Sequence, residues 1–328
     1  MNTEVFNVNT HPTVSVVIPT FNRPDMLRLA VKSVLDQTLR DIEIIVVDDG
    51  STNDNQHLLL EFHDNRITYV RHEVNKGLPV ARNTGIRQAR GKFVAFLDDD
   101  DRWMPDKLKE QLAAIDGYDA VVCGYYENDE NDLENAVIQP VTEVIIHNLL
   151  RENIFPPSGL LVRADIIKEL QFDERLNFGE DWDLLMRIAC KHRTYNVRKP
   201  LFVKTVAHPT MTTALKGMTI DALEERILAT EKHKDLLGPF WYNYRIAARL
   251  LSYIRARENI LARVRYTIRR CGLVPTTWVL IDRFFRYVTK TARRRTQVKQ
   301  RTGHEKVATS GFVIWSKYLT SMWKKPGR

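Results

Sequence analysis

Cysteine is scarce in this sequence, with only Cys123, Cys190 and Cys271 among 328 residues. No two of them have the spacing of paired metal ligands, and three scattered residues cannot build a disulfide framework. The sequence therefore argues against a cysteine metal site and against a disulfide-stabilised secreted fold. A reducing cytosol fits this cysteine usage best.

Long apolar runs are also missing. No uninterrupted apolar stretch reaches the length of about 18 residues that a transmembrane helix requires. The opening residues, MNTEVFNVNTHPT, contain neither the basic region nor the apolar core of a signal peptide. We therefore expect a cytoplasmic protein without a transmembrane helix. No internal repeat or low-complexity tract is present either.

Charge is plentiful but unevenly distributed. Residues 1–216 contain 25 Lys/Arg and 33 Asp/Glu, a net charge of −8. Residues 217–328 contain 24 Lys/Arg and 8 Asp/Glu, a net charge of +16, so the two parts sum to the +8 of the whole chain. This asymmetry predicts two parts with different partners, a domain over 1–216 and a basic helical region over 217–328.

Strand and helix patterns alternate four times in the first 100 residues. The predicted strands are 14–18, 42–47, 67–72 and 92–97, and the predicted helices begin at 24, 53 and 78. Gly91 stands where a left-handed residue would close the third helix. The alternation predicts an α/β fold with a mostly parallel, Rossmann-like sheet flanked by helices. The pattern is mixed from 104 to 205 and helical from about 219 onward.

Polar clusters follow three of the predicted strands, at Pro19-Thr20, at Asp48-Asp49 and at Asp98 to Asp101. Parallel α/β sheets bind ligands at the carboxyl ends of their strands. The sequence therefore predicts a binding site where these clusters meet.

Four consecutive carboxylates at 98–101 repel one another unless something neutralises them. Hard divalent cations prefer oxygen ligands, and Mg²⁺ is often held by one or two carboxylates together with substrate phosphates. Asp98 and Asp100 point the same way if the strand continues, because side chains alternate along a strand. The alternative is a solvated acidic turn before the helix predicted at 105.

Two other acidic groups allow two interpretations each. One of Asp48 and Asp49 could form an Asx turn before Gly50, or a carboxylate there could bind a base or a ribose. The acidic residues Glu180, Asp181 and Asp183 could stabilise the first turn of a helix, or one of them could be a general base.

Three long segments resemble family 2 glycosyltransferases of the GT-A fold. VSVVIPTFNRPDMLRLAVKSVLDQTLRDIEIIVVDDGSTNDN resembles the opening of that family, and NKGLPVARNTGIRQARGKFVAFLDDDD resembles the segment that ends in its DXD motif. FDERLNFGEDWDLLMRI is similar to its acceptor-side segment. The resemblance covers residues 13–210 and leaves 217–328 without a family signature.

The resemblance implies a site for a nucleotide sugar, with UDP-sugars the usual donors of the family. The residues that it assigns to the donor are Pro19, Thr20, Phe21, Asp48, Asp49, Arg82, Asn83, Asp98 and Asp99. Asp49 matches the position that typically contacts the base.

The resemblance also implies Mn²⁺ or Mg²⁺ as cofactor. Asp100 would be the direct ligand, and Asp98 would lie closer to the ribose and to waters of the metal. His208 resembles a histidine that approaches the metal in some members, although a partly exposed loop histidine is an equal alternative. The residue between the two acids of DXD is often small, whereas here it is Asp99, so which two of the four acids bind the metal stays open.

Asp181 matches the general base of the family, and Glu180 and Trp182 lie on the acceptor side. The base would remove the proton of an acceptor hydroxyl, which attacks the sugar from the face opposite the diphosphate and inverts the anomeric carbon. Trp182 could stack on an acceptor sugar, but a tryptophan in such a helix is more often part of the core.

The resemblance and the basic region together predict a bacterial enzyme that extends a lipid-linked glycan in surface polysaccharide synthesis. A nucleic-acid-binding protein and an inactive scaffold are the alternatives. No nucleic-acid motif supports the first, so no nucleic acid is expected as a partner. Intact Asp100 and Asp181 argue against the second.

The basic region predicts a membrane partner. Residues 239–328 contain 21 Lys/Arg against Glu258, Asp282 and Glu305. Trp315, Tyr318, Leu319, Met322 and Trp323 fall on one helical face. Basic helices with tryptophan on the apolar side suit an anionic membrane surface. We therefore expect peripheral binding to the inner face of the cell membrane, the alternative being that these aromatics pack onto the catalytic domain.

Overall fold

The computed structural model describes residues 11–128, 136–139, 141–150, 155–205, 219–224, 226–252 and 260–285. The chain divides into two compact units, Met1–Thr276 and Thr277–Arg328. No helix in the described part is both long and apolar enough to cross a membrane. The predicted boundary after residue 216 falls outside the described residues and stays a prediction.

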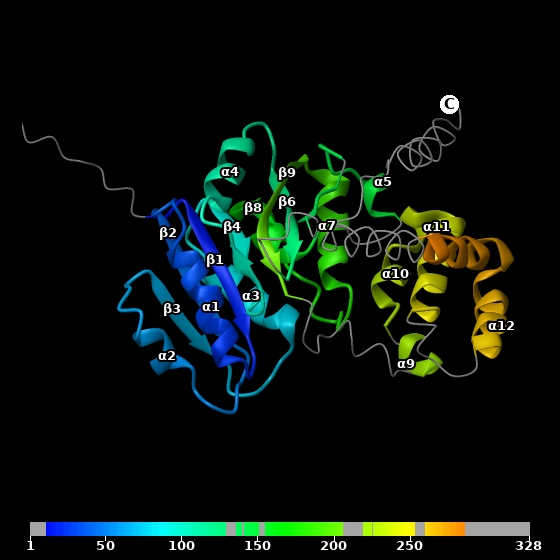
Figure 1. Cartoon of the computed structure of the whole chain (residues 1–328), viewed down its shortest axis with the longest axis horizontal. Coiled ribbons are helices and arrows are strands. Elements are labelled where there is room, and N and C mark those ends of the chain that lie inside the picture. The colour runs from blue at the N-terminus through cyan, green and yellow to red at the C-terminus, as the bar shows by residue number, and fades with distance from the viewer. Residues whose placement is uncertain are drawn as a thin grey trace, which may run out of the picture. The chain divides into compact units, whose positions relative to one another are not determined.

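Among the described residues of the first unit, nine strands form a single sheet. Figure 1 shows this sheet. The strands are β1 (Val14–Thr20), β2 (Ile42–Asp48), β3 (Ile67–Arg71), β4 (Phe93–Phe96), β5 (Arg102–Trp103), β6 (Ala120–Glu127), β7 (Ala136–Val137), β8 (Leu161–Arg163) and β9 (Thr194–Lys204). Their order is β3-β2-β1-β4-β8-β6-β9-β5, with β7 paired to β6.

The sheet contains both parallel and antiparallel strand pairs. β3, β2, β1 and β4 are parallel, as the alternation of strands and helices predicts. β8 then lies antiparallel between β4 and β6, and β5 pairs antiparallel with β9. The α/β prediction is therefore confirmed. The predicted parallel strands β1 to β4 lie within residues 14–96 and are connected by helices, and β6 and β9 form a further parallel pair.

The helices of the first 200 residues are α1 (Pro24–Leu35), α2 (Gln56–Leu60), α3 (Leu78–Gln88), α4 (Lys107–Ala114), α5 (Ile146–Leu149), α6 (Ala164–Leu170) and α7 (Glu180–Lys191), with a 3-10 turn η2 (Pro157–Gly159). The later helices include α9 (Ile220–Glu224), α10 (Leu228–Lys232), α11 (Lys234–Leu250) and α12 (Ile260–Cys271), and residues 273–285 are helical as well. The predicted helical character after 219 is confirmed for these segments.

Both faces of the parallel strands are buried. Val14, Val16 and Ile18 share one core cluster with apolar residues of α1, α2 and α4. Val17 faces the other side, where Gly85 of α3 is so close that an added Cβ would lie 2.3 Å from a Val17 methyl carbon. Burial on both faces explains why these strands are continuous apolar runs in the sequence.

The expected role of Gly91 as a left-handed helix cap is wrong. α3 ends at Gln88 and is capped by Ala89 in an extended conformation. Gly91 is needed for a different reason, because a Cβ there would lie 2.7 Å from the backbone nitrogen of Ser15. The glycine therefore permits the chain entering β4 to approach β1.

Candidate functional site

The carboxyl ends of β1, β2 and β4 meet at one edge of the sheet, because these strands are parallel. β1 ends at Thr20, which is buried, and β4 is followed directly by the four aspartates. The Thr20 hydroxyl donates a hydrogen bond to Asp99 Oδ2 at 2.8 Å, which ties the two strand ends together. Phe21 is 42% exposed beside them, so its ring can contact a ligand at this edge.

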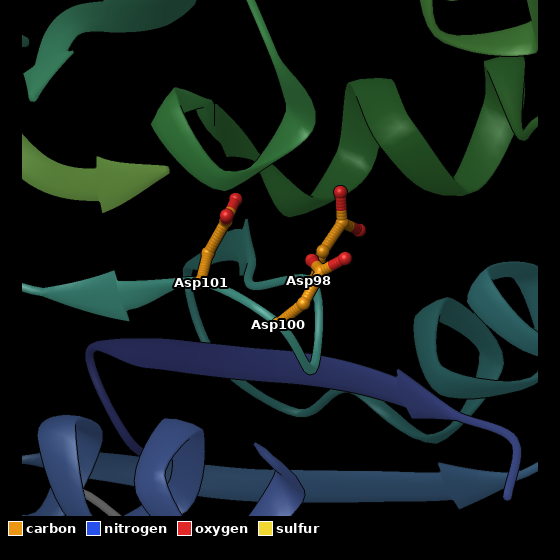
Figure 2. Close-up of side chains that lie close together, drawn as sticks. All are labelled: Asp98, Asp100 and Asp101. Atoms are coloured by element: carbon orange, nitrogen blue, oxygen red, sulfur yellow. The ribbon is translucent and has the colours of Figure 1, made fainter. Parts of the chain in front are cut away.

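Asp98, Asp100 and Asp101 form a compact carboxylate cluster. One carboxylate oxygen from each lies within 4.8 Å of the others. Figure 2 shows the three carboxyl groups projecting from the loop after β4 toward the same side. Asp98 and Asp100 come together as expected, but for another reason: β4 ends at Phe96, and the loop turns through a hydrogen bond from Asp101 N to Asp98 O of 3.0 Å.

Asp101 is a member of this cluster that the predicted site lacks. It is 2% exposed and accepts hydrogen bonds from Ser158 Oγ at 2.6 Å and from Thr205 N at 3.1 Å. Ser158 also accepts a hydrogen bond from Asp98 N, so η2 fixes the shape of the loop. The run of four acids is the sequence signal for Asp101, whereas nothing in the sequence marks Ser158.

The cluster fits a hard divalent cation. Burial raises the pKa of Asp101 well above its usual value, and the nearby charges of Asp98 and Asp100 raise it further. Burial also raises the pKa of Asp99 to about 6. Such crowding is costly unless positive charge enters, and carboxylate oxygens are the ligands that Mg²⁺ and Mn²⁺ prefer.

Arg82 is buried against the cluster, and its contact with the donor stays a prediction. Its side chain is 2% exposed. One guanidinium nitrogen lies 2.7 Å from Asp98 Oδ1 and the other 2.9 Å from Glu180 Oε1. Arg82 therefore connects the loop after β4 to the first residue of α7.

Asn83 binds the segment before α7, and its contact with the donor stays a prediction. Its amide nitrogen donates to Phe172 O at 2.9 Å, and its Oδ1 accepts from Phe172 N at 2.8 Å. Asn83 is 1% exposed. This two-way bond fastens α3 to the segment before α7, so the residue has a structural role.

Glu180 and Asp181 open α7. Gly179 precedes them with a left-handed φ of 79°, which a glycine adopts without strain and which turns the chain into the helix. Burial and the neighbouring Asp181 raise the pKa of Glu180 to about 7, against the opposing effect of Arg82. Glu180 is thus buried and paired with Arg82, and its place on the acceptor side stays a prediction.

Asp181 faces an apolar cavity. Its neighbours there come from β6, from the segment around η2 and from α7, and they are Val122, Phe155, Pro156, Pro157, Leu160, Phe172, Leu184 and Leu185. Burial raises the pKa of Asp181, while Arg82 acts in the opposite direction. A carboxylate in such surroundings is a stronger base than one in water, because the charged form is poorly solvated.

Trp182 is not available to stack on an acceptor sugar, so the alternative of a core residue is correct. It is 1% exposed, and its indole nitrogen donates to Leu149 O at 2.9 Å. The guanidinium of Arg245 covers the ring at 3.5 Å from its centroid. The ring points inward because it lies on the apolar face of α7.

Asp48 has the structural role that was one of its two interpretations, although its backbone bond reaches three residues on, to Ser51, and not the two residues of an Asx turn. Its buried carboxylate accepts hydrogen bonds from Ser51 N, Asn55 Nδ2 and Tyr69 Oη at 2.7, 2.7 and 2.9 Å. These three hydrogen bonds fix the turn that follows β2.

Asp49 holds the loop before α3. It accepts from Lys76 N and Gly77 N, at 2.9 and 2.8 Å, and lies 2.7 Å from His72 Nδ1. Contact between Asp49 and a nucleotide base stays a prediction. His208 and the Trp315–Trp323 face lie outside the described residues, and the expectations about them also stay predictions.

Residues 15–169 match the family described as Glycosyl transferase family 2. The chain is 32% identical over 276 residues to an uncharacterized glycosyltransferase of Rickettsia conorii, covering 79% of this chain and 43% of that protein. It is 30% identical over 195 residues to WcaA of Escherichia coli strain K12, whose name places it in colanic acid biosynthesis, covering 56% of this chain and 68% of WcaA.

A shorter match connects the chain to a characterised activity. Over 102 residues it is 39% identical to the Escherichia coli enzyme WfgD, named as a UDP-Glc:alpha-D-GlcNAc-diphosphoundecaprenol beta-1,3-glucosyltransferase. That match covers 31% of this chain and 40% of WfgD.

Two solved structures share the fold. TarS residues 1–349 of S. aureus in complex with UDP-GlcNAc has a TM-score of 0.59 at 21% identity, covering 81% of this chain and 90% of that one. A mannosyltransferase of Pyrobaculum calidifontis in complex with GDP-Man and Mn²⁺ has a TM-score of 0.57 at 18% identity, covering 97% of this chain and 89% of that one.

Proposed function

The chain belongs to glycosyl transferase family 2, and we propose that it transfers a sugar from a UDP-linked donor to a hydroxyl group of a glycan, with inversion at the anomeric carbon. The observation that carries this proposal is the connection between two acidic groups. The cluster Asp98, Asp100 and Asp101 is joined through Arg82 to the turn that holds Glu180 and Asp181. One group can hold a donor diphosphate, and the other can deprotonate an acceptor.

Asp100 and Asp98 would hold the divalent cation, with Asp101 as a further oxygen ligand in the same cluster. When bound, the cation would neutralise the charge that develops on the leaving diphosphate. The compact cluster and the Mn²⁺ in the solved mannosyltransferase support this assignment. Phe21 and Thr20 at the end of β1 would lie along the nucleotide, and Asp49 would approach its base.

Asp181 would be the general base. Its carboxylate would accept the proton of the acceptor hydroxyl as that oxygen attacks the anomeric carbon opposite the diphosphate. The apolar cavity favours proton uptake, because it raises the pKa of the carboxyl group. The positive charge of Arg82 opposes this effect, because it favours the charged carboxylate.

A lipid-linked glycan is the acceptor that the relatives support. WfgD acts on a diphosphoundecaprenol-linked sugar by its name, and WcaA is named for colanic acid biosynthesis. The basic region over 217–328 would bring the enzyme to the inner face of the membrane where such a substrate lies. These relatives match only part of the chain, so surface polysaccharide synthesis is the proposed pathway class for the whole protein.

A panel of nucleotide sugars tests the function directly. Purified protein is incubated with each donor, with and without Mn²⁺, and release of nucleoside diphosphate is measured. We expect release from a UDP-sugar that requires the cation and is lost in Asp100→Ala. Release from no donor, combined with salt-sensitive binding of DNA, would instead support a nucleic-acid-binding protein.

A further inference from the structure

Arg23 places a positive charge on the carboxylate cluster. It precedes α1 directly, in the loop that follows β1. Its Nη1 atom lies 3.1 Å from Asp100 Oδ2 and 3.2 Å from Asp99 Oδ1. The side chain is 34% exposed, whereas that of Asp100 is 17% exposed, so the ion pair lies at the border between protein and solvent.

The backbone of Arg23 is fixed while its guanidinium is held at a single atom. Leu27 N donates to Arg23 O at 3.0 Å, and the neighbouring Asn22 N donates to Ser51 Oγ at 2.8 Å. In the part of the chain that the structure describes, both ion-pair contacts of Arg23 use Nη1. The other donors of the guanidinium, Nε and Nη2, make no hydrogen bond to any described residue. One planar edge of the guanidinium can therefore bind a second anion.

Arg23 and a divalent cation compete for Asp100. Both are positive, and such charges repel each other strongly when they lie a few ångströms apart in a partly buried site. A divalent cation bound to the Asp100 carboxylate would therefore break the ion pair between Arg23 and Asp100. Arginine binds phosphate with two parallel N–H groups, so a diphosphate at the same edge of the sheet would offer a better partner.

We propose that Arg23 occupies Asp100 while the donor site is empty, and that its guanidinium transfers to the donor diphosphate when cation and nucleotide bind together. The diphosphate half of this inference rests on the proposed function. The exchange keeps the acidic cluster partly neutralised without a cation, and it makes cation and nucleotide binding mutually dependent. It also means that loss of the Arg23 charge should affect the two ligands in opposite directions.

The test measures Mn²⁺ alone and UDP separately. The electron paramagnetic resonance signal of free Mn²⁺ reports cation binding without nucleotide, and isothermal titration reports UDP binding at saturating Mn²⁺. The variants are Arg23→Gln and Arg23→Lys. Arg28→Gln is the matched control, because it removes the same charge from α1, where Arg28 pairs with Glu61 at the surface.

Removal of the charge in Arg23→Gln should tighten Mn²⁺ binding by at least about threefold, since the competing cation is gone. It should also weaken UDP binding by about tenfold, the usual size of a lost charge-assisted hydrogen bond. Arg23→Lys should bind Mn²⁺ as the wild type does, and Arg28→Gln should change neither affinity. A merely structural role for Arg23 would weaken both ligands in Arg23→Gln.

Unchanged or weaker Mn²⁺ binding by Arg23→Gln would overturn the proposal, as would a wild type that binds no Mn²⁺. Unchanged UDP affinity would overturn the transfer to the diphosphate. The proposed function fails in a separate way: wild type that binds Mn²⁺ but no nucleotide is not a nucleotide-sugar enzyme, and the competition at Asp100 can still be read from Mn²⁺ alone.

Discussion

Asp181 and Asp183 are two residues apart on α7, yet burial and neighbours shift their pKa values in opposite directions. For Asp181 burial prevails and raises the pKa. For Asp183 burial acts the same way, but hydrogen bonds from His233 and Lys232 more than offset it and lower the pKa. At the residue scale, the chemistry of an acid in this protein is therefore decided by which cations reach it.

The base assignment is tested by Asp181→Asn. We expect normal folding and near-normal binding of the donor, with turnover reduced at least about 100-fold, because the amide cannot accept a proton. Initial rates and UDP titration on the same preparation measure the two effects. Asp165→Asn is the control, since Asp165 occupies the first turn of α6 and its side chain is 64% exposed. Retention of more than a tenth of the activity would place the base elsewhere.

Lys107 gives a pH-dependent prediction. It is fully buried on α4, 2.6 Å from Gln111 Oε1 and 3.9 Å from the centre of the Trp103 ring, and burial lowers its pKa to about 8. The unfolded chain holds this proton up to about pH 10.4, so between pH 8 and that value it binds more protons than the folded protein. The contribution of Lys107 to stability therefore rises with pH in this window.

Lys107→Met should remove that dependence. Relative to the variant, the free energy of unfolding of the wild type should rise by about 2–3 kcal/mol between pH 7 and pH 10, because most of the interval between the two pKa values lies in this range. Urea unfolding at both pH values measures the difference. Lys109→Met, at an exposed position of the same helix, should follow the wild type. Parallel pH profiles of Lys107→Met and wild type would contradict the prediction.

At the scale of elements, the first turn of α7 is held by three other parts of the fold. Arg82 binds its first residue, Trp182 enters the core beneath Arg245 of α11, and Asp183 joins α10. Asp183 is fully buried and lies 2.7 Å from His233 Nε2, 2.8 Å from Lys232 Nζ and 2.9 Å from Arg187 Nε. The turn that carries Asp181 is therefore positioned in part by helices that follow residue 219.

A double-mutant cycle measures this coupling. Asp183→Asn should lower the free energy of unfolding by about 3 kcal/mol, because it breaks a buried network of charges. His233→Ala should cost less, since Lys232 and Arg187 remain on the carboxylate. The double variant should lose less than the sum of the two, by an interaction energy of about 0.5–3 kcal/mol. Strict additivity in urea unfolding would show that α7 and α10 are independent here.

At the scale of the whole molecule, the sheet and the helices up to Thr276 form one compact unit. Removal of every residue after 216 would remove the contact of Arg245 with the Trp182 ring and that of His233 with the Asp183 carboxylate. A test of the basic region must therefore leave these helices in place. Residues 286–328 contain 12 Lys/Arg and a single acid, Glu305, and they can be removed without touching either contact.

Removal of residues 286–328 should release the protein from anionic vesicles and leave Mn²⁺-dependent donor hydrolysis largely intact. Each basic residue near an anionic surface contributes about 1 kcal/mol before screening, so a fraction of the twelve is enough to hold the protein. Co-sedimentation with phosphatidylglycerol vesicles measures binding, with neutral phosphatidylcholine vesicles as the control. High salt should weaken the binding of the full chain without abolishing it.

Two outcomes would contradict this prediction. If the full-length chain does not bind anionic vesicles, the basic region is not a membrane-binding surface. A shortened chain that becomes insoluble shows that residues 286–328 pack against the rest of the protein, which was the alternative for the aromatic residues in this region. The chain shortened at 216 should be insoluble in either case, because it lacks Arg245 and the apolar ring of Trp182 would be exposed to solvent.

The sequence by itself determined the parallel half of the sheet, the helices between its strands, the family and the position of the acidic cluster. These follow from local patterns: apolar runs buried on both faces, helical spacing in α1, and polar residues directly after strands. The run of acids at 98–101 is contiguous, so its members must lie close together in any fold.

Only the tertiary structure decided what each polar side chain faces. Arg82 and Asn83 are adjacent, yet one binds Asp98 and Glu180 and the other binds Phe172, across 98 and 89 residues of sequence. The cover of Trp182 by Arg245 and the position of Arg23 on Asp100 also depend on distant segments. Burial and charge pairing are properties of the folded surroundings, and no local spacing encodes which distant group will arrive.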